Sequence, residues 1–275
     1  MIMTRLALAA AFCLYGASAM AQTVSVPQVE GTDEGSYALG GAVLINPQYV
    51  GSNETRVLPL PYIDVRNYKG FDFTPFTVSY SAVDYLSGEG LWAWGVTAGP
   101  QASWEFGRDD DDGDELIGLE EIGSSVYLGG YSRIRLGPVG VRLEGGQDVI
   151  DGTGGAKFDA SIGTRLPLGE GSLTAGYTFN WGSEEYVESF FGVSRLAAER
   201  SAFNAFEADG GIYANTATVL GQYPLKKNWE LTALASYRQY KGDAEDSPVI
   251  IAETGSSDGL TLVLGVSKRF GFTNR

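Results

Sequence analysis

The chain has 275 residues, of which 44% are hydrophobic, 12% aromatic and 19% charged, and 38 are glycine. This composition excludes an intrinsically disordered chain, which carries few aromatic residues and a higher proportion of charge. The formal net charge of −15 argues against a nucleic-acid partner, because neutralising phosphates requires a basic face.

The first 21 residues have the layout of a secretory signal peptide. Arg5 supplies the basic region, residues 6–16 are largely apolar, and Ala19 and Ala21 occupy the small-residue positions ahead of a cleavage site. The apolar run is too short to span a membrane as a helix. We expect cleavage after Ala21, which makes residues 1–21 the signal peptide and 22–275 the mature domain.

The chemistry available to the mature chain is restricted. The sequence contains no histidine, and its one cysteine, Cys13, lies inside the signal peptide. The usual base of serine hydrolases is therefore missing, as are histidine and cysteine ligands for zinc. We expect no enzyme activity, no cofactor, and no catalytic, cofactor-binding or metal-binding residues.

Apolar and polar residues alternate with a period of two along the rest of the chain, which predicts half-buried β-strands. In residues 172–181, the alternation places Leu173, Ala175, Tyr177 and Phe179 on one face and Thr174, Gly176 and Thr178 on the other. The pattern predicts strands near residues 37–46, 55–66, 71–80, 91–106, 124–136, 139–149, 156–167, 171–182, 211–224, 228–240 and 259–270.

These segments fit either a soluble β-sandwich or a transmembrane antiparallel β-barrel. The polar faces are rich in Gly, Ser and Thr and carry opposite charges two residues apart, as in Arg142 with Glu144 and Lys157 with Asp159. A barrel explains this, because its polar face lines the interior and its apolar face meets lipid. Aromatic residues at strand ends suit an interfacial girdle: Trp92, Trp94, Trp104, Phe106, Trp181 and Trp229.

The connections alternate between short turns and long polar loops, which is the pattern of an outer-membrane barrel. Turns at 136–140, 168–171 and 225–228 are expected on the periplasmic side, and loops near 107–123, 181–210 and 241–258 on the extracellular side. Eleven strands are visible, whereas bacterial barrels use even numbers. We therefore predict about 12 strands, with one missed or merged between residues 67 and 90, and keep 10 as the alternative.

The stretch "RDDDDGDE" at residues 108–115 is expected to be a solvated extracellular loop. Asp110 and Asp112 suit a calcium loop with Gly113 as its turn glycine, but Arg108 occupies the first ligand position. Like charges packed this closely repel and are most stable when hydrated. A specific metal site is therefore the weaker hypothesis.

Charged residues on the polar faces are candidates for the barrel lumen, where they either line a narrow passage or close it by pairing. The set comprises Arg66, Arg133, Arg135, Arg142, Lys157, Arg165, Arg238 and Arg269, with Asp64, Glu105, Glu144, Asp159 and Glu230. The only candidate for carboxylate chemistry is the pair Glu184 and Glu185.

Several motifs resemble the MipA/OmpV family of outer-membrane proteins. The signature region at 46–67 carries Tyr49, Gly51, Ser52, Arg56 and the run Leu58-Pro59-Leu60-Pro61. The further matches, in family order, are "GRDDDD" at 107–112, "LGGY" and "RLGP" within 128–138, "EYVESFFGV" at 185–193 and "GDAEDSP" at 242–248. In this chain the two prolines remove strand donors and so suit an edge. "FFGV" is placed to fold a loop back over the barrel mouth, and Asp246 to accept turn hydrogen bonds.

The resemblance implies a non-enzymatic outer-membrane protein that acts as a scaffold, linking the lytic murein transglycosylase MltA to a penicillin-binding protein. Residues 22–36 and 271–275 would then be the natural periplasmic contacts, with Phe270 as the assembly signal and a short tail after it. Outer-membrane lipid and lipopolysaccharide are the other expected partners. A narrow channel, a barrel that binds a small solute or ion, and a surface adhesin are the alternatives.

Overall fold

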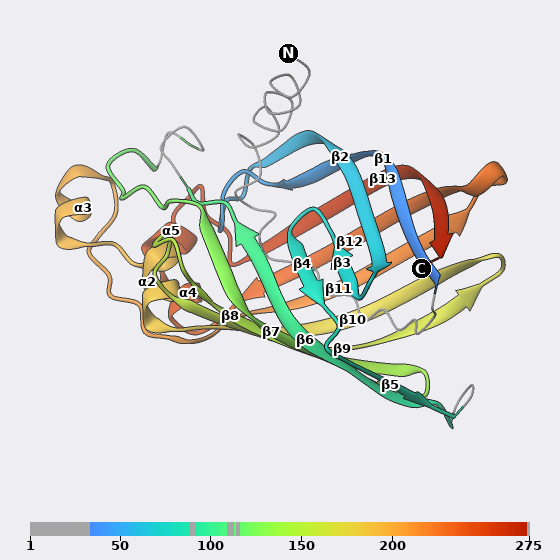
Figure 1. Ribbon diagram of the computed structural model, residues 1–275. Helices are drawn as coiled ribbons and strands as arrows, with labels where there is room; N and C mark the ends of the chain where they lie inside the picture. The colour runs from blue at the N-terminus through green and yellow to red at the C-terminus, as the bar shows by residue number, and fades with distance from the viewer. Residues whose placement is uncertain (1–33, 89–91, 109–112, 114–115, 274–275) are drawn as a thin grey trace, which may run out of the picture.

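The computed structural model describes residues 34–88, 92–108, 113 and 116–273 (Figure 1). The expected signal peptide, its cleavage site and the acidic residues Asp109–Asp112, Asp114 and Glu115 lie outside these residues. No helix in the described part of the chain is long and apolar enough to cross a membrane.

The described residues form one antiparallel sheet of thirteen strand segments that closes on itself. Neighbouring segments in the order β4-β3-β2-β1-β13-β12-β11-β10-β9-β8-β7-β6-β5 are hydrogen-bonded, and β4 also pairs with β6. The segments are β1 (Glu34–Pro47), β2 (Thr55–Tyr68), β3 (Phe71–Phe73), β4 (Thr77–Tyr80), β5 (Val83–Ser87), β6 (Trp94–Glu105), β7 (Ser125–Leu136), β8 (Val139–Asp148), β9 (Ala156–Leu168), β10 (Gly171–Gly182), β11 (Gly211–Pro224), β12 (Trp229–Tyr240) and β13 (Asp258–Thr273).

β4 and β5 are two halves of one interrupted strand, because both pair with β6. Thr77 of β4 lies opposite Ser103, and Val83 of β5 lies opposite Ala98, so the register shifts by one residue between them. Counted this way, the barrel has twelve strands, as the sequence predicts. The predicted single strand 71–80 is wrong, because the chain reverses at 74–76 between β3 and β4. The alternation also missed β5, which is the second half of the strand that β4 begins.

The joint between β4 and β5 depends on Gly99. A Cβ added at this glycine would collide with the carbonyl oxygen of Tyr80. Gly99→Ala should therefore destabilise the barrel by about 1–3 kcal/mol, the usual cost of overpacking, and lower the fraction of protein that runs as the folded band in unheated gel electrophoresis. Gly41→Ala is the matched control, because its nearest neighbour would lie 4.0 Å away. Equal loss in both variants would contradict this role for Gly99.

Side chains face outward and inward as the alternation predicts. On β10, Tyr177 and Phe179 are 39% and 46% exposed, whereas Thr174 and Thr178 are 3% and 6% exposed. Exposed apolar side chains continue around the other strands, so the outside of the barrel is apolar and its inside is polar. This inside-out pattern is that of a barrel that spans a membrane.

The connections separate the barrel into two ends. One end has the short turns, including Gly137–Pro138 and Gly169–Glu170, and there the first strand begins and the last strand ends (Figure 1). The other end carries the long connections 48–54, 106–124, 183–210 and 241–257.

The last strand differs from the expectation at its end. Phe270 stacks on Tyr37 with ring centroids 5.0 Å apart. However, β13 continues to Thr273 instead of ending in a free tail, because Gly271, Phe272 and Thr273 still pair with β1.

Candidate functional site: the barrel lumen and its cap

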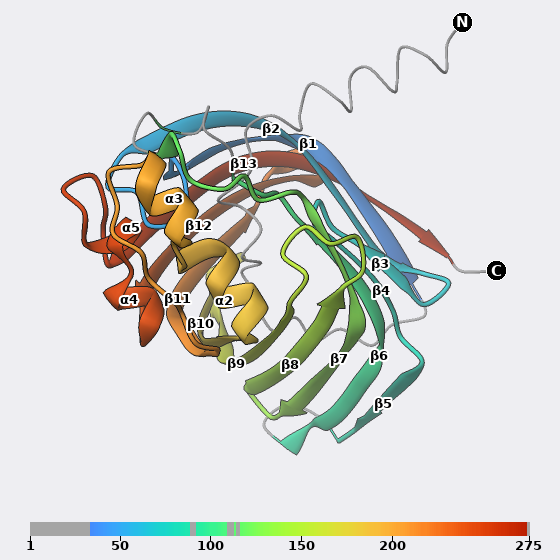
Figure 2. The ribbon, with the colours of Figure 1, turned by 90° about the vertical axis from the view of Figure 1, so that its left-hand side faces the viewer.

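Four short helices gather at the long-loop end of the barrel, and we call them the cap (Figure 2). They are α2 (Glu184–Phe191), α3 (Arg195–Arg200), α4 (Asp243–Asp246) and α5 (Pro248–Ile251). Serines begin two of them, because a serine hydroxyl can satisfy an unpaired backbone N–H at a helix start. The Ser194 hydroxyl accepts from the amide of Ala197, and the Ser247 hydroxyl accepts from the amide of Val249.

The aromatic face of α2 is the centre of the cap. Tyr186, Phe190 and Phe191 are almost completely buried and pack against Tyr213 and Tyr240 on the barrel wall. The two phenylalanines belong to the "EYVESFFGV" motif, so the expectation that this motif folds back over the mouth is confirmed. Most of the buried apolar side chains of the described residues lie here and not within the barrel.

A buried ion pair on the lumenal side of α2 anchors this helix to the barrel wall. The Nζ of Lys157 lies 2.8 Å from Oε2 of Glu105, and the Tyr186 hydroxyl donates to Oε1 of the same carboxylate at 3.1 Å. Lys157 also lies 4.1 Å above the Tyr127 ring. Burial, followed by the charge of Glu105, raises the pKa of Tyr186 well above its ordinary value, so its hydroxyl remains a donor at neutral pH.

Polar contacts from other loops hold the end of α2. Arg108 donates from Nη1 to the carbonyl oxygen of Phe190 at 3.0 Å, and the Ser247 hydroxyl donates to the carbonyl oxygen of Phe191 at 2.6 Å. These carbonyls would otherwise lack partners at the helix end. Ser247, not Asp246, is therefore the residue of "GDAEDSP" with a positioning role.

The family motifs that are distant in the sequence meet in the cap. Tyr49 is fully buried in one cluster with Val249, and Ser52 forms a β-bridge with Gly255. Arg108, Phe191 and Ser247 come from three further motifs. The sequence alone did not reveal this, because the alternation pattern reports local structure and carries no information on which loops touch.

Charged residues of the middle lumen are paired, either within one strand or between strands. The Nη2 of Arg142 lies 2.6 Å from Oε2 of Glu144, as the sequence predicts, and Gln101 bridges both side chains. The predicted partnership of Lys157 with Asp159 is wrong. Lys157 instead reaches Glu105, three strands along the barrel wall, whereas Asp159 accepts from the Asn180 amide at 2.7 Å.

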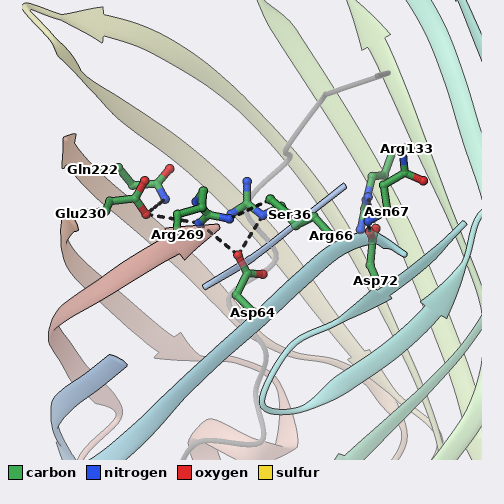
Figure 3. Close-up of polar contacts among 9 residues, drawn as sticks. All are labelled: Ser36, Asp64, Arg66, Asn67, Asp72, Arg133, Gln222, Glu230 and Arg269. Carbon is green, nitrogen blue, oxygen red and sulfur yellow. Dashed lines mark hydrogen bonds and ion pairs between the residues drawn. The ribbon is translucent and has the colours of Figure 1, made fainter. Parts of the chain in front are cut away.

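Ion pairs also line the lumenal wall at the short-turn end (Figure 3). Asp64 lies between Arg66 at 2.9 Å and Arg269 at 3.2 Å, and Arg269 also contacts Glu230 at 3.4 Å. A second contact joins Arg133 to Asp72 at 3.4 Å. Charges of both signs therefore meet at each level of the lumen, which favours closure over an open passage of one charge sign.

The candidate carboxylate pair has no catalytic setting. Glu184 and Glu185 are exposed in the first turn of α2. Hydrogen bonds from the Glu185 amide and the Ser183 hydroxyl lower the pKa of Glu185, which disfavours an acid role. Among the described residues, no group of three or more acidic, histidine or cysteine side chains could hold a metal ion. Most of the acidic stretch after Arg108 lies outside those residues.

Comparison with known proteins gives a consistent picture. The sequence profile of the family described as "MltA-interacting protein MipA" matches residues 39–270. "Putative outer membrane protein YiaT" of Escherichia coli K12 is 26% identical over 84% of this chain and 89% of its own. "MltA-interacting protein" of the same organism is 24% identical over 79% of this chain and 85% of its own.

Solved structures show only a weak likeness to this chain. The translocator domain of the autotransporter NalP from Neisseria meningitidis has a TM-score of 0.37 and 10% identity, covering 98% of this chain and 97% of its own. OmpT of Vibrio cholerae has a TM-score of 0.35 and 8% identity, covering 90% of this chain and 100% of its own.

Proposed function

The chain belongs to the MltA-interacting protein MipA family, and from that premise we propose that it is a non-enzymatic outer-membrane barrel that serves as a periplasmic scaffold. Its partner would be a lytic murein transglycosylase of the MltA type, brought together with a penicillin-binding protein. The transglycosylase is suggested by the name of one relative, "MltA-interacting protein". The cap over the long-loop end, together with the paired charges of both signs along the lumen, is the structural observation that best supports a scaffold over a conduit.

The short-turn end is the surface that such a scaffold would offer. Short turns are periplasmic in outer-membrane barrels, so this orientation also places the cap outside the cell. The turn between β11 and β12 carries Lys226 and Lys227, both exposed. In a chain of net charge −15, two adjacent basic side chains on a projecting turn provide a local site for an acidic partner surface.

Affinity capture on an immobilised MltA-type transglycosylase tests this proposal. We expect the purified barrel, held in nanodiscs, to be retained, and the variant Lys226→Glu/Lys227→Glu to be retained several-fold less, because reversed charges weaken association. Lys241→Glu is the matched control, since that lysine lies at the cap end in a surface pair with Glu245. Failure of the wild-type barrel to bind would overturn the scaffold proposal, and equal loss with Lys241→Glu would place the contact elsewhere.

The alternatives have less support. A channel would need an open lumen, whereas the cap covers the long-loop end of the described barrel and ion pairs lie along its lumen. A carboxylate enzyme would need paired, shielded acids, which Glu184 and Glu185 are not. Outer-membrane lipid and lipopolysaccharide remain the expected surroundings of the apolar wall and the extracellular loops.

A further inference from the structure

The barrel wall contains an interruption beside β2. Between β2 and β3, only Val65 pairs with Phe73 and Tyr68 with Phe71. The stretch Thr55–Asp64 pairs with β1 and has no second partner strand among the described residues. Figure 1 shows the reason, since only the short β3–β4 hairpin lies between the long strands β2 and β6. We call Thr55–Asp64 the open edge.

The open edge is deficient in hydrogen-bond donors on its free side. The pairing of β1 with β2 ends at Pro47 and Thr55, and the next pair along is Gln48 with Glu54. The Gln48 amide donates to the Glu54 carbonyl, so this pair is a hydrogen-bonded one. In an antiparallel ladder every second pair exchanges hydrogen bonds. The pairs Leu44–Leu58 and Ala42–Leu60 therefore exchange them, and Pro59 and Pro61 direct their backbone nitrogens toward the free side.

Two consequences follow from these prolines. A proline nitrogen has no hydrogen to leave unpaired, so the free side is less costly in hydrocarbon than an ordinary strand edge. The same absence makes the edge a poor template for an added strand from a partner, which would need those donors. The expectation that the two prolines occupy an edge is confirmed.

The lumen wall beside the middle of the open edge, between the inward-facing Arg56 and Asp64, is apolar. Leu58 and Leu60 share the inward face with Asp64 and Arg66, which make lumenal ion pairs. Five inward-facing apolar residues lie directly opposite one another on the successive strands β11, β12, β13, β1 and β2, and the last belongs to the open edge: Leu220, Leu234, Val263, Leu44 and Leu58. Leu60 and Ala42 lie beside the end of this row. We call these seven residues the lumenal apolar patch.

We propose that an acyl chain of a membrane phospholipid enters the barrel wall at the open edge and lies on the lumenal apolar patch. The outward side chains of the edge already face lipid, with Val57 62% and Ile63 50% exposed. The open edge extends roughly 33 Å at about 3.3 Å per residue. At the usual strand tilt it therefore spans the apolar band of about 25 Å.

The two ends of the lumen do not offer an apolar approach to the patch. The cap covers the long-loop end, and at the short-turn end Asp64, Arg66 and Arg269 place charged side chains on the lumenal wall (Figure 3). In a membrane, the medium outside the open edge is hydrocarbon. An acyl chain that moves onto the patch exchanges one apolar contact for another, whereas water there would face six leucine and valine side chains and one alanine.

Quenching of a bimane label by brominated phospholipid tests this proposal. In a Cys13→Ser background, bimane at Leu60→Cys in vesicles of phosphatidylcholine with brominated acyl chains should be quenched nearly as strongly as at Ile63→Cys, which faces outward. Thr178→Cys, inward on the far wall, should be quenched several-fold less. Adding Leu234→Gln to Leu60→Cys should reduce the quenching, while adding it to Ile63→Cys should leave it unchanged. Every variant is first checked for the folded band without heating.

The outcomes discriminate between occupants. Quenching of the Leu60→Cys label by aqueous iodide and not by brominated lipid would mean a wet lumen and overturn the proposal. Lipid quenching that arises only after deletion of residues 22–33 would mean that this segment of the chain occupies the patch, which also overturns it. Equal lipid quenching at Thr178→Cys would show a loosened barrel and no specific site.

Discussion

Replacing Glu105 with alanine should lower the free energy of unfolding by about 3–5 kcal/mol, the typical cost of leaving one member of a buried ion pair unpaired. The carboxylate is 2% exposed and its partner Lys157 is 11% exposed. Loss of Glu105 would also remove the acceptor of the Tyr186 hydroxyl. Urea titration of the barrel in detergent micelles, followed by tryptophan fluorescence, measures the change.

Two controls separate this buried pair from charge loss in general. Glu245→Ala removes the partner of Lys241 in a surface pair, whose side chains are 32% and 44% exposed. It should change the free energy by less than about 1 kcal/mol. The double variant Glu105→Ala/Lys157→Met should recover part of the stability, because no buried charge remains unpaired. If Glu105→Ala behaved like Glu245→Ala, the pair would contribute nothing to anchoring α2.

Replacing Phe190 and Phe191 together with alanine should detach the cap while the barrel stays folded. Each is 1% exposed, and truncating a buried phenylalanine typically costs about 3–5 kcal/mol. That energy is lost from a few short helices, whose other anchors are single hydrogen bonds and a smaller apolar cluster, whereas the strand ladder loses no hydrogen bond. Limited trypsin digestion should then cleave at Arg195 or Arg200 many-fold faster than in the wild-type protein.

Leu196→Ala is the matched control for this effect. Leu196 lies on α3 in the same loop and is 57% exposed, so its truncation leaves no cavity. Digestion of this variant should match the wild-type rate, and the unheated folded band should persist in both variants. Loss of that band in the double phenylalanine variant would show that the cap is part of the folding core of the barrel, contrary to this account.

The sequence predicted the long strands and their facing well, because both depend on local alternation. Thr174 and Thr178 lie inside, and Tyr177 and Phe179 outside, since a strand with a lipid face and a lumen face has no other stable register. The prediction of strands between residues 67 and 90 failed for a related reason. β3 spans only Phe71–Phe73, too short for two full periods of alternation, and the register shift between β4 and β5 disrupts the period where the strand continues.

The functional features depended on contacts that the sequence could not supply. Lys157 and Asp159 lie on one face, as their spacing requires, but Lys157 pairs with Glu105, which is 52 residues away in sequence and three strands along the barrel wall. Arg108 was recognised only as a residue unsuited to a calcium loop, whereas in the structure it caps α2. The motifs can therefore be detected in the sequence, but the contacts between them can be seen only in the folded barrel.

Single-channel recording in planar bilayers tests most directly whether the lumen is closed. The purified wild-type barrel should insert without steady conductance steps, because the cap covers the long-loop end and paired charges line the short-turn end. The Phe190→Ala/Phe191→Ala variant, with Asp64→Ala added to release Arg66 and Arg269, should give ohmic steps at the same protein concentration and thereby show that insertion occurs. Stable, voltage-independent steps from the wild-type barrel would contradict the account and favour a channel.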